Sequence, residues 1–123
     1  MTPVSNQNTE AREEMYAIHA ESIHVYQRML RIRPDDAEAF LNMFWARKYA
    51  CDWRDWTQNL ERMHVMVRRQ LEEGKPPSLK PFLALAFPIP AALYLEIAAA
   101  HAKEEARKAT ALTAVCSKVC SKV

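Results

Sequence analysis

One glycine in 123 residues is the feature that most limits what this chain can fold into. Loops that cradle the phosphates of a nucleotide need several glycines, because the backbone must turn tightly and approach the phosphate closely. The chain offers only Gly74, so we exclude a complete nucleotide-binding loop of the P-loop or dinucleotide type. Half of the residues are apolar and about a quarter are charged, which is typical of a globular protein.

Apolar side chains recur every three or four residues in two long stretches, as one buried helical face requires. The first helix is expected over 10–33, and Pro34 ends it because the residue before a proline avoids the helical region. A second helix begins in "PDDAEAF", where Asp35 or Asp36 can cap its N-terminus. The expected buried face of the first helix comprises Met15, Ile18, Ser22, Tyr26, Met29 and Leu30.

A third helix is expected over 54–73, with Leu60, Met63, His64, Val67 and Leu71 on one face. Gly74 follows as a left-handed residue at its end, and the proline-rich "PPSLKP" then forms an extended connector. The stretch "PFLALAFP" is compatible with a short strand or with an irregular buried segment. A fourth helix is expected from about Pro90 to around residue 112.

These elements predict an all-α fold with four parts. A disordered N-terminus over 1–9 precedes terminal helices over 10–50, which are followed by a long helix, a connector and a further helix over 51–112. The tail over 113–123, with its direct repeat "VCSKVCSK", has no cap or turn signal and is expected to be disordered.

Composition also bounds the partners and the compartment. A net charge of +2 is too small to indicate nucleic-acid binding, and no stretch has the apolar length of a membrane span. The N-terminal residues lack the apolar core of a secretory signal. Three cysteines, an odd number, then favour reduced thiols in a cytoplasmic or nuclear protein.

No set of residues forms an evident catalytic or metal centre. The four histidines, His19, His24, His64 and His101, show no metal-binding pair spacing, and Cys116 and Cys120 lack the second pair that structural zinc needs. A Cys51–His64 nucleophile is conceivable, but a buried small hydrophobe is the better interpretation of Cys51. Asp52 and Asp55 are interpreted as caps of the third helix rather than as an acid–base pair. We therefore expect neither catalytic residues nor a metal or cofactor site.

The segment around Pro34, from Ser22 to Met43, has the pattern of a tetratricopeptide repeat (TPR). A small residue, Ser22, allows close helix approach, and the aromatic ring of Tyr26 fills the gap between helices. Pro34 makes the turn, and "AEAFLNM", which contains Phe40, Asn42 and Met43, opens the next helix. Because such units lean on their neighbours, we expect the N-terminal face to be apolar and adhesive, or to be capped by something outside this chain.

Two further motifs come next along the chain. The cluster "KYACDWRDW" contains Cys51, Asp52 and Trp53, and we expect the cysteine and the tryptophan to be buried in a hinge core. The second motif, "PPSLKPFLALAFP", contains Pro77, Ser78, Pro81, Phe82, Phe87 and Pro88. The helix "AALYLEIAAAHA" comes after it.

This order of motifs, over residues from about 17 to 102, resembles the TPR-containing protein O-GlcNAc transferases of glycosyltransferase family 41, in their plant-like branch. The resemblance implies a transfer of GlcNAc from UDP-GlcNAc to serine or threonine of intracellular proteins, which the TPR surface binds as protein or peptide acceptors. Cys-Asp-Trp and the Pro-Phe and Phe-Pro pairs would be structural motifs at the start of the catalytic region.

The chain departs from the family pattern at two places. Leu83 stands where a histidine is common, and Pro90 or Ala91 stands where animal-type members carry another. The glycine-bearing nucleotide lobes of the family are missing. We therefore expect a fragment without transferase activity of its own. The alternatives are a non-catalytic TPR-like adaptor that binds peptides, and a remnant that folds poorly.

Overall fold

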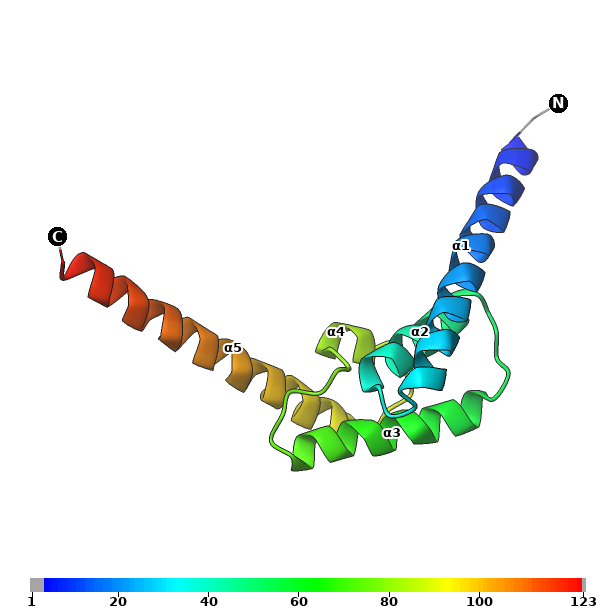
Figure 1. Ribbon diagram of the computed structural model, residues 1–123. Coiled ribbons are helices and arrows are strands. Elements are labelled where there is room, and N and C mark those ends of the chain that lie inside the picture. The colour runs from blue at the N-terminus through cyan, green and yellow to red at the C-terminus, as the bar shows by residue number, and fades with distance from the viewer. Residues whose placement is uncertain (1–3, 123) are drawn as a thin grey trace. The chain divides into compact units, whose positions relative to one another are not determined.

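The computed structural model describes residues 4–122, and their side chains from residue 8 onward. Over this range the chain forms the helices α1 (Val4–Ile32), α2 (Ala37–Tyr49), α3 (Trp56–Glu72), α4 (Pro81–Ala84) and α5 (Ala91–Cys120) (Figure 1). No strand occurs among the described residues, which confirms the predicted all-α fold.

The chain divides into two compact units, Met1–His64 and Val65–Val123, with the boundary inside α3. In the first unit α1 packs against α2, and the core is formed largely by α2. Its buried side chains are Ala39, Phe40, Leu41, Met43, Phe44, Ala46 and Met63. Successive buried residues in α2 mean that this helix is covered on most sides, as expected of a helix that is apolar around its circumference.

The predicted cap of α2 is confirmed at Asp36, whose carboxylate accepts a hydrogen bond of 3.0 Å from the N–H of Ala39. The turn before it also agrees with the prediction, because α1 ends at Ile32, two residues before Pro34. Arg47 and Lys48 lie in the last turn of α2, where positive charge suits the helix dipole.

The second unit has its own small core, in which α4 packs against α5. Buried side chains come from the end of α3, the connector, α4 and the first turns of α5: Val67, Pro77, Leu79, Ala84, Phe87, Leu93 and Ile97. Met63 and Val67, expected on the buried face of the third helix, are 0% and 1% exposed, while Leu60, His64 and Leu71 are half-buried.

The segment "PFLALAFP" is neither a strand nor wholly irregular. Residues 81–84 form the single turn α4, with Pro81 at a first-turn position, where the missing N–H of proline costs nothing. The bonds from Ala86 N–H to the Leu83 carbonyl and from Phe87 N–H to the Ala84 carbonyl then continue it as turns.

Both chain ends differ from the expected disorder. Residues 113–120 continue α5, and residues 4–9 belong to α1, while residues 1–3 of the expected disordered segment lie outside the described residues. No glycine or proline interrupts the sequence between Ala91 and Cys120, so nothing in it stops the helix. The ion pairs Glu104–Arg107 and Glu105–Lys108 add support across one turn.

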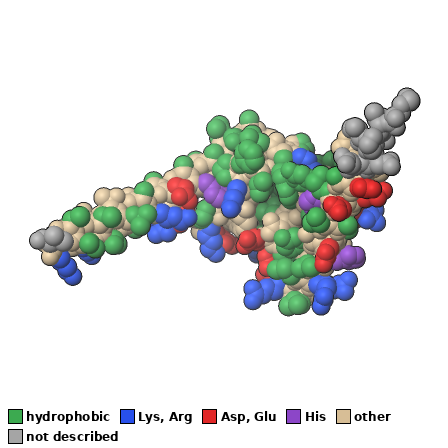
Figure 2. Space-filling view, turned by 90° about the horizontal axis from the view of Figure 1, so that it is seen from above, with side chains coloured by type: hydrophobic (Ala, Val, Ile, Leu, Met, Phe, Trp, Pro, Cys, Tyr) green, Lys and Arg blue, Asp and Glu red, His purple; other side chains and the backbone are tan. Residues whose placement is uncertain are grey.

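The C-terminal half of α5 is exposed. Figure 2 shows hydrophobic side chains at its surface, with lysine and arginine side chains among them. Leu112, Val115 and Val119 are 67%, 58% and 61% exposed. This half of α5 is therefore held by helix propensity and ion pairs rather than by tertiary packing.

Candidate functional site

Residues 50–55 connect α2 to α3 and contain the Cys-Asp-Trp motif at 51–53. The N–H of Cys51 donates to the carbonyl of Lys48 at 3.1 Å, and the N–H of Asp52 donates to the carbonyl of Arg47 at 2.8 Å. These two bonds form a Schellman motif, which needs a left-handed residue just after the helix. Cys51 fills that position with φ +53, although glycine is the usual residue there.

The expected burial of Cys51 and Trp53 is wrong. Cys51 is exposed and Trp53 is 54% exposed. Trp56, the first residue of α3, packs instead on Phe44, which is 1% exposed, with 5.0 Å between ring centroids. The reason is that the turn after α2 keeps the chain at the surface until α3 begins. Trp53 lies edge-on to Trp56, also with 5.0 Å between ring centroids.

Asp52 serves the turn rather than α3. Its carboxylate accepts from Arg54 Nε and Nη2, both at 2.9 Å, and from the Arg54 N–H at 3.2 Å. The hydrogen bonds from the guanidinium lower the pKa of Asp52 to about 2 from its ordinary 3.8. Asp55 adopts φ +56, and its carboxylate makes no hydrogen bond. The predicted capping of α3 by either aspartate is therefore wrong.

The second motif begins in a connector that α3 and α5 hold in place. Gly74 has φ +71, and its N–H donates to the Leu71 carbonyl while the N–H of Lys75 donates to the Gln70 carbonyl, both at 3.0 Å. This is a second Schellman motif, and it confirms the left-handed position predicted for the only glycine.

Gln70 and His101 fix the connector beyond this turn. The side-chain oxygen of Gln70 accepts from the N–H of Ser78 at 2.9 Å, and its nitrogen donates to the Ser78 hydroxyl at 2.8 Å. His101 Nε2 donates to the carbonyl of Pro77 at 2.8 Å, since a carbonyl can only accept. Pro77 is fully buried, and Leu79 is 2% exposed. The motif is thus held through both backbone and side chains.

The remaining residues of this motif divide into buried and exposed positions. Pro81 starts α4, and Phe87 is 6% exposed in the core of its unit. Phe82 is 81% exposed, and Pro88 is also exposed. The Pro-Phe pair therefore carries an aromatic ring that the described chain leaves uncovered.

The TPR-type positions lie in and around the α1–α2 contact. Phe40 and Met43 are 0% and 6% exposed, while Ser22, Tyr26 and Asn42 are half-buried. Ser22 donates its hydroxyl to the carbonyl of Ile18 in its own helix at 3.0 Å.

The turn at Pro34 is tied to α3 by one arginine. Arg62 Nη2 donates to the Pro34 carbonyl at 2.6 Å, and its guanidinium carbon lies 4.5 Å from the ring centroid of Phe40. A charged group over an aromatic face is attracted by the ring quadrupole. Arg62 therefore connects the proline turn, the α2 core and α3.

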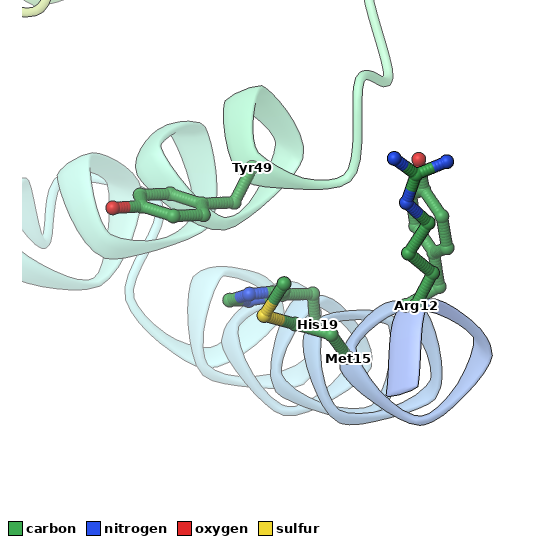
Figure 3. A pocket seen from close by; sticks show the side chains of 5 residues that line it. Arg12, Met15, His19 and Tyr49 are labelled. Carbon is green, nitrogen blue, oxygen red and sulfur yellow. The ribbon is translucent and has the colours of Figure 1, made fainter. Parts of the chain in front are cut away.

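A pocket of about 200 Å³ lies between the N-terminal half of α1 and the end of α2 (Figure 3). His19 and Tyr49 stack with 5.3 Å between ring centroids, and Arg12, Met15 and Tyr16 complete the lining. The lining has aromatic faces and one cation but no carboxylate, thiol or hydroxyl of serine or threonine. It is therefore chemically suited to binding, because it lacks a nucleophile and an acid–base pair.

A second hollow lies in the other unit, between the end of α3 and the middle of α5, and Leu71, Lys75, Pro76 and Lys103 are among its residues. Its cations are largely neutralised within the site. Lys75 pairs with Glu73 at 3.0 Å, and Arg107 pairs with Glu104 at 2.7 Å. The hollow therefore lacks the concentrated positive charge that a phosphate site uses.

No metal-binding cluster assembles among the described residues. Nowhere in residues 4–122 do three histidine, cysteine or acidic side chains come close enough to hold a metal ion. Cys51 makes no hydrogen bond to His64, so the conceivable nucleophile pair is not formed. Cys116 and Cys120 are exposed free thiols on α5. The described helices also include none with the length and hydropathy that a membrane crossing needs.

Gln70, His101 and Arg62 are the residues that sequence reasoning missed. Each acts on a backbone group or ring that lies 8 to 28 positions away in the sequence. No motif of closely spaced residues predicts contacts over such distances in the sequence. A partial signal exists for Gln70, because this glutamine stands in the last turns of α3 and the Pro-Ser pair follows shortly after the helix ends.

Comparisons with known proteins give one finding. The family model of glycosyl transferase family 41 matches residues 50–118, which is more than half of the chain. Neither the curated proteins nor the solved structures contain a match to this chain. The matched range begins at the turn that ends α2 and includes both motif segments, α3, α4 and nearly all of α5. The chain belongs to glycosyl transferase family 41.

Proposed function

We propose that this chain is the junction module of a protein O-GlcNAc transferase of the plant-like branch. Residues 10–50 would be the last TPR-like helices, and 51–112 the linker and opening helices of the catalytic region. The observation that carries the proposal is the start of the family match at residue 50, where α2 ends in its Schellman turn. The first residue that the family model matches thus lies directly after the last residue of α2.

The proposed role is to present an acceptor rather than to bind the sugar nucleotide. The family's donor is UDP-GlcNAc and its acceptors are serine and threonine of intracellular, cytoplasmic or nuclear proteins. A diphosphate needs backbone N–H groups at a glycine-rich turn or a cluster of free cations. Gly74 is the single glycine, and in the hollow that it lines Lys75 and Arg107 are already paired with Glu73 and Glu104. We therefore assign this chain no transferase activity of its own.

The test uses the purified chain with UDP-GlcNAc carrying a labelled sugar and a peptide rich in serine and threonine. We expect no label in the peptide, and no heat of binding when UDP is titrated into the protein. Transfer above the level of a heat-denatured control would contradict the assignment, whichever peptide accepts the sugar.

A second candidate, a peptide-binding adaptor without chemistry, is favoured by the pocket between α1 and α2. Stacked His19 and Tyr49 offer aromatic surface, and Arg12 offers a cation for an acidic or carbonyl group. Genomic sequence beyond codon 123 distinguishes the two candidates, since only the transferase requires glycine-bearing nucleotide lobes there.

A peptide array probed with the labelled chain tests the pocket directly. If the pocket holds peptides, Tyr49→Ala lowers binding at least about tenfold, as expected when an aromatic contact at the centre of a site is removed. Lys108→Ala, an exposed change on α5 in the other unit, serves as the control and should bind normally. Equal binding by both variants would remove the pocket from the peptide site.

A further inference from the structure

The C-terminal half of α5 has an apolar face that contains both of the cysteines of this helix. With about 100° per residue, the side chains of Leu112, Val115, Cys116, Val119 and Cys120 fall within an arc of roughly 140°. The leucine and the two valines are 67%, 58% and 61% exposed, and both thiols are exposed and free. We call these five residues the thiol face, which extends over about 12 Å of helix.

The opposite side of this half of α5 is polar. Every lysine and every serine or threonine hydroxyl of residues 109–122 lies outside the arc. The hydroxyls lie on one flank of the thiol face, where Thr110 and Thr113 already donate to backbone carbonyls of their own helix at 3.0 and 2.9 Å. The lysines lie on the other flank. The half-helix is therefore amphipathic, and its apolar side contains no polar group except the two thiols.

The charge of this half-helix has one sign. Residues 109–122 contain Lys118 and Lys122 and no acidic residue. The nearest acids along α5, Glu104 and Glu105, pair with other cations, and neither lysine forms an ion pair with a described residue. A lysine beside an apolar face can keep its alkyl stem on that face and extend its ammonium group to a lipid headgroup. The half-helix is thus complementary to an anionic bilayer surface.

We propose that Cys116 and Cys120 are S-acylated with long-chain fatty acids, and that the thiol face then lies on an anionic membrane surface. In each transfer the cysteine sulfur attacks the carbonyl carbon of a fatty acyl-coenzyme A thioester. A new sulfur–carbon bond forms, and the bond from the acyl carbon to the coenzyme A sulfur breaks. The cysteine proton passes to the released coenzyme A thiolate. One thioester replaces another, so nothing is oxidised or reduced.

The spacing of the two cysteines suits double acylation. Residues four apart on a helix are neighbours on one side, so both acyl chains leave α5 in nearly the same direction and enter one bilayer together. The thiol face has no aromatic side chain, so we expect it to bind a membrane weakly before acylation. One lipid chain gives marginal anchoring, whereas two chains, or one chain with basic residues, give stable anchoring. The two thiols and the flanking lysines supply both combinations.

The third cysteine lacks these surroundings. Cys51 is also exposed, but it lies in the turn after α2, where Asp52 and Asp55 are its acidic neighbours. It therefore serves as an internal control, because it is an accessible thiol without an amphipathic basic helix around it.

Exposed apolar side chains also occur on α1. Met15, Ile18 and Met29, which the sequence predicted on a buried face, are 54%, 62% and 42% exposed. Met15 lines the pocket beside α2, and α1 contains no cysteine. The surface of α1 therefore has no acceptor for an acyl group.

Acyl transfer to the full 123-residue chain tests the modification site. The purified protein is incubated with palmitoyl-coenzyme A and with phosphatidylcholine vesicles that contain about one-third phosphatidylserine. Peptide mass spectrometry then locates the acyl groups. We expect them at Cys116 and Cys120, removable by neutral hydroxylamine, and at least about tenfold less at Cys51, because the acyl donor is concentrated in the bilayer that the thiol face contacts. Equal acylation of all three cysteines, or none at the pair, would overturn the proposal.

Flotation of the acylated chain with the same vesicles tests the anchoring. We expect the acylated native chain to float with the vesicles, and the untreated chain to stay mostly in solution. Cys116→Ser combined with Cys120→Ser, treated in the same way, should also stay in solution, while Cys51→Ser should float as the native chain does. An acylated native chain that stays in solution, including one that binds another protein through α5, would contradict the membrane surface as the partner.

Matched glutamine variants test which side of α5 meets the bilayer. Val115→Gln combined with Val119→Gln changes the thiol face, whereas Ala111→Gln combined with Ala114→Gln changes positions outside the arc. The first pair should slow acylation of the two thiols about tenfold, because the thiol face then approaches the bilayer less often. The second pair should leave the rate unchanged, and circular dichroism should show equal helix content in both. Equal slowing by both pairs would exclude the thiol face as the contact.

The role of charge has its own pair of variants. Lys118→Gln combined with Lys122→Gln should slow acylation on the anionic vesicles at least about tenfold, since each lysine near the surface contributes to the attraction. On vesicles of phosphatidylcholine alone the same variant should match the native chain. Lys75→Gln combined with Lys103→Gln removes the same charge elsewhere in the unit and should leave the rate unchanged. A native rate in the Lys118 and Lys122 variant on anionic vesicles would overturn the anionic surface.

Discussion

At the scale of single residues, Cys51 occupies a backbone position that favours glycine. An L-residue in the left-handed region costs roughly 1–2 kcal/mol, and only glycine avoids this cost. Cys51 is exposed, so removing its thiol costs little packing. We predict that Cys51→Gly raises the free energy of unfolding by about 0.5–1 kcal/mol, after the larger chain entropy of unfolded glycine is subtracted.

Urea denaturation of three variants checks this prediction. Cys51→Ala keeps the strained backbone and should match the native protein, while Cys51→Val should be less stable because a branched side chain tolerates positive φ poorly. A glycine variant no more stable than the alanine variant would mean that this turn does not hold φ +53 in solution.

The two tryptophans of the junction should differ in their contribution to stability. Trp53 is 54% exposed, so Trp53→Ala should lower the free energy of unfolding by about 1 kcal/mol or less. Trp56 packs on the buried Phe44, and Trp56→Ala should cost about 2–3 kcal/mol. Thermal unfolding measured by circular dichroism gives both values, and a larger cost at Trp53 would restore the buried hinge that the sequence suggested.

Asp52 carries the residue-scale prediction for pH. Its folded pKa of about 2 lies below the ordinary 3.8, so the Arg54 contact stabilises the fold above about pH 4. That stability is lost as the pH falls through the interval from 3.8 to 2, because the carboxyl group is then protonated in both states. Arg54 is exposed, and solvent screening keeps this contribution small.

The measurement is a carboxyl titration by NMR in the native chain and in Arg54→Ala. The native value should be near 2, and the variant's value should rise toward 3.8. Glu105→Gln is the control, since it removes an ion pair on α5 without touching the junction. An unchanged Asp52 pKa in the arginine variant would assign the shift to another group.

At the scale of elements, the connector between α3 and α4 depends on one helix side chain. Both polar atoms of Gln70 bond to Ser78, so Gln70→Ala removes two hydrogen bonds and leaves a half-buried N–H without its acceptor. We predict a loss of about 1–3 kcal/mol in unfolding free energy, and faster amide exchange at Ser78. Arg68→Ala, an exposed neighbour on the same helix, should change neither.

The elements themselves were largely predictable because their signals are local. Asp36 as a cap, Pro34 as a stop and Gly74 as a left-handed end each act within a few residues, and the structure has all three. The helical end of α5 was missed because its direct repeat carries no cap or turn signal. Residues 113–120 contain no glycine or proline that would stop a helix, and Ala114 and Lys118 favour one.

The candidate site was less predictable for a physical reason. The positions of the motif residues in the sequence could be identified. The burial expected of Cys51 and Trp53, however, was inferred from residue type alone. Their exposure is set by the path of the backbone after α2, which no residue type specifies. Contacts such as His101 with Pro77 join positions 24 apart. Only the packing of α5 brings these groups together.

At the scale of the whole molecule, uncovered apolar surface is the common feature. Phe82 on α4, the side chains of Ile18, Val25 and Ile32 on α1, and the stripe of Leu112, Val115 and Val119 on α5 are all exposed. Large apolar patches on a protein surface mark places of association.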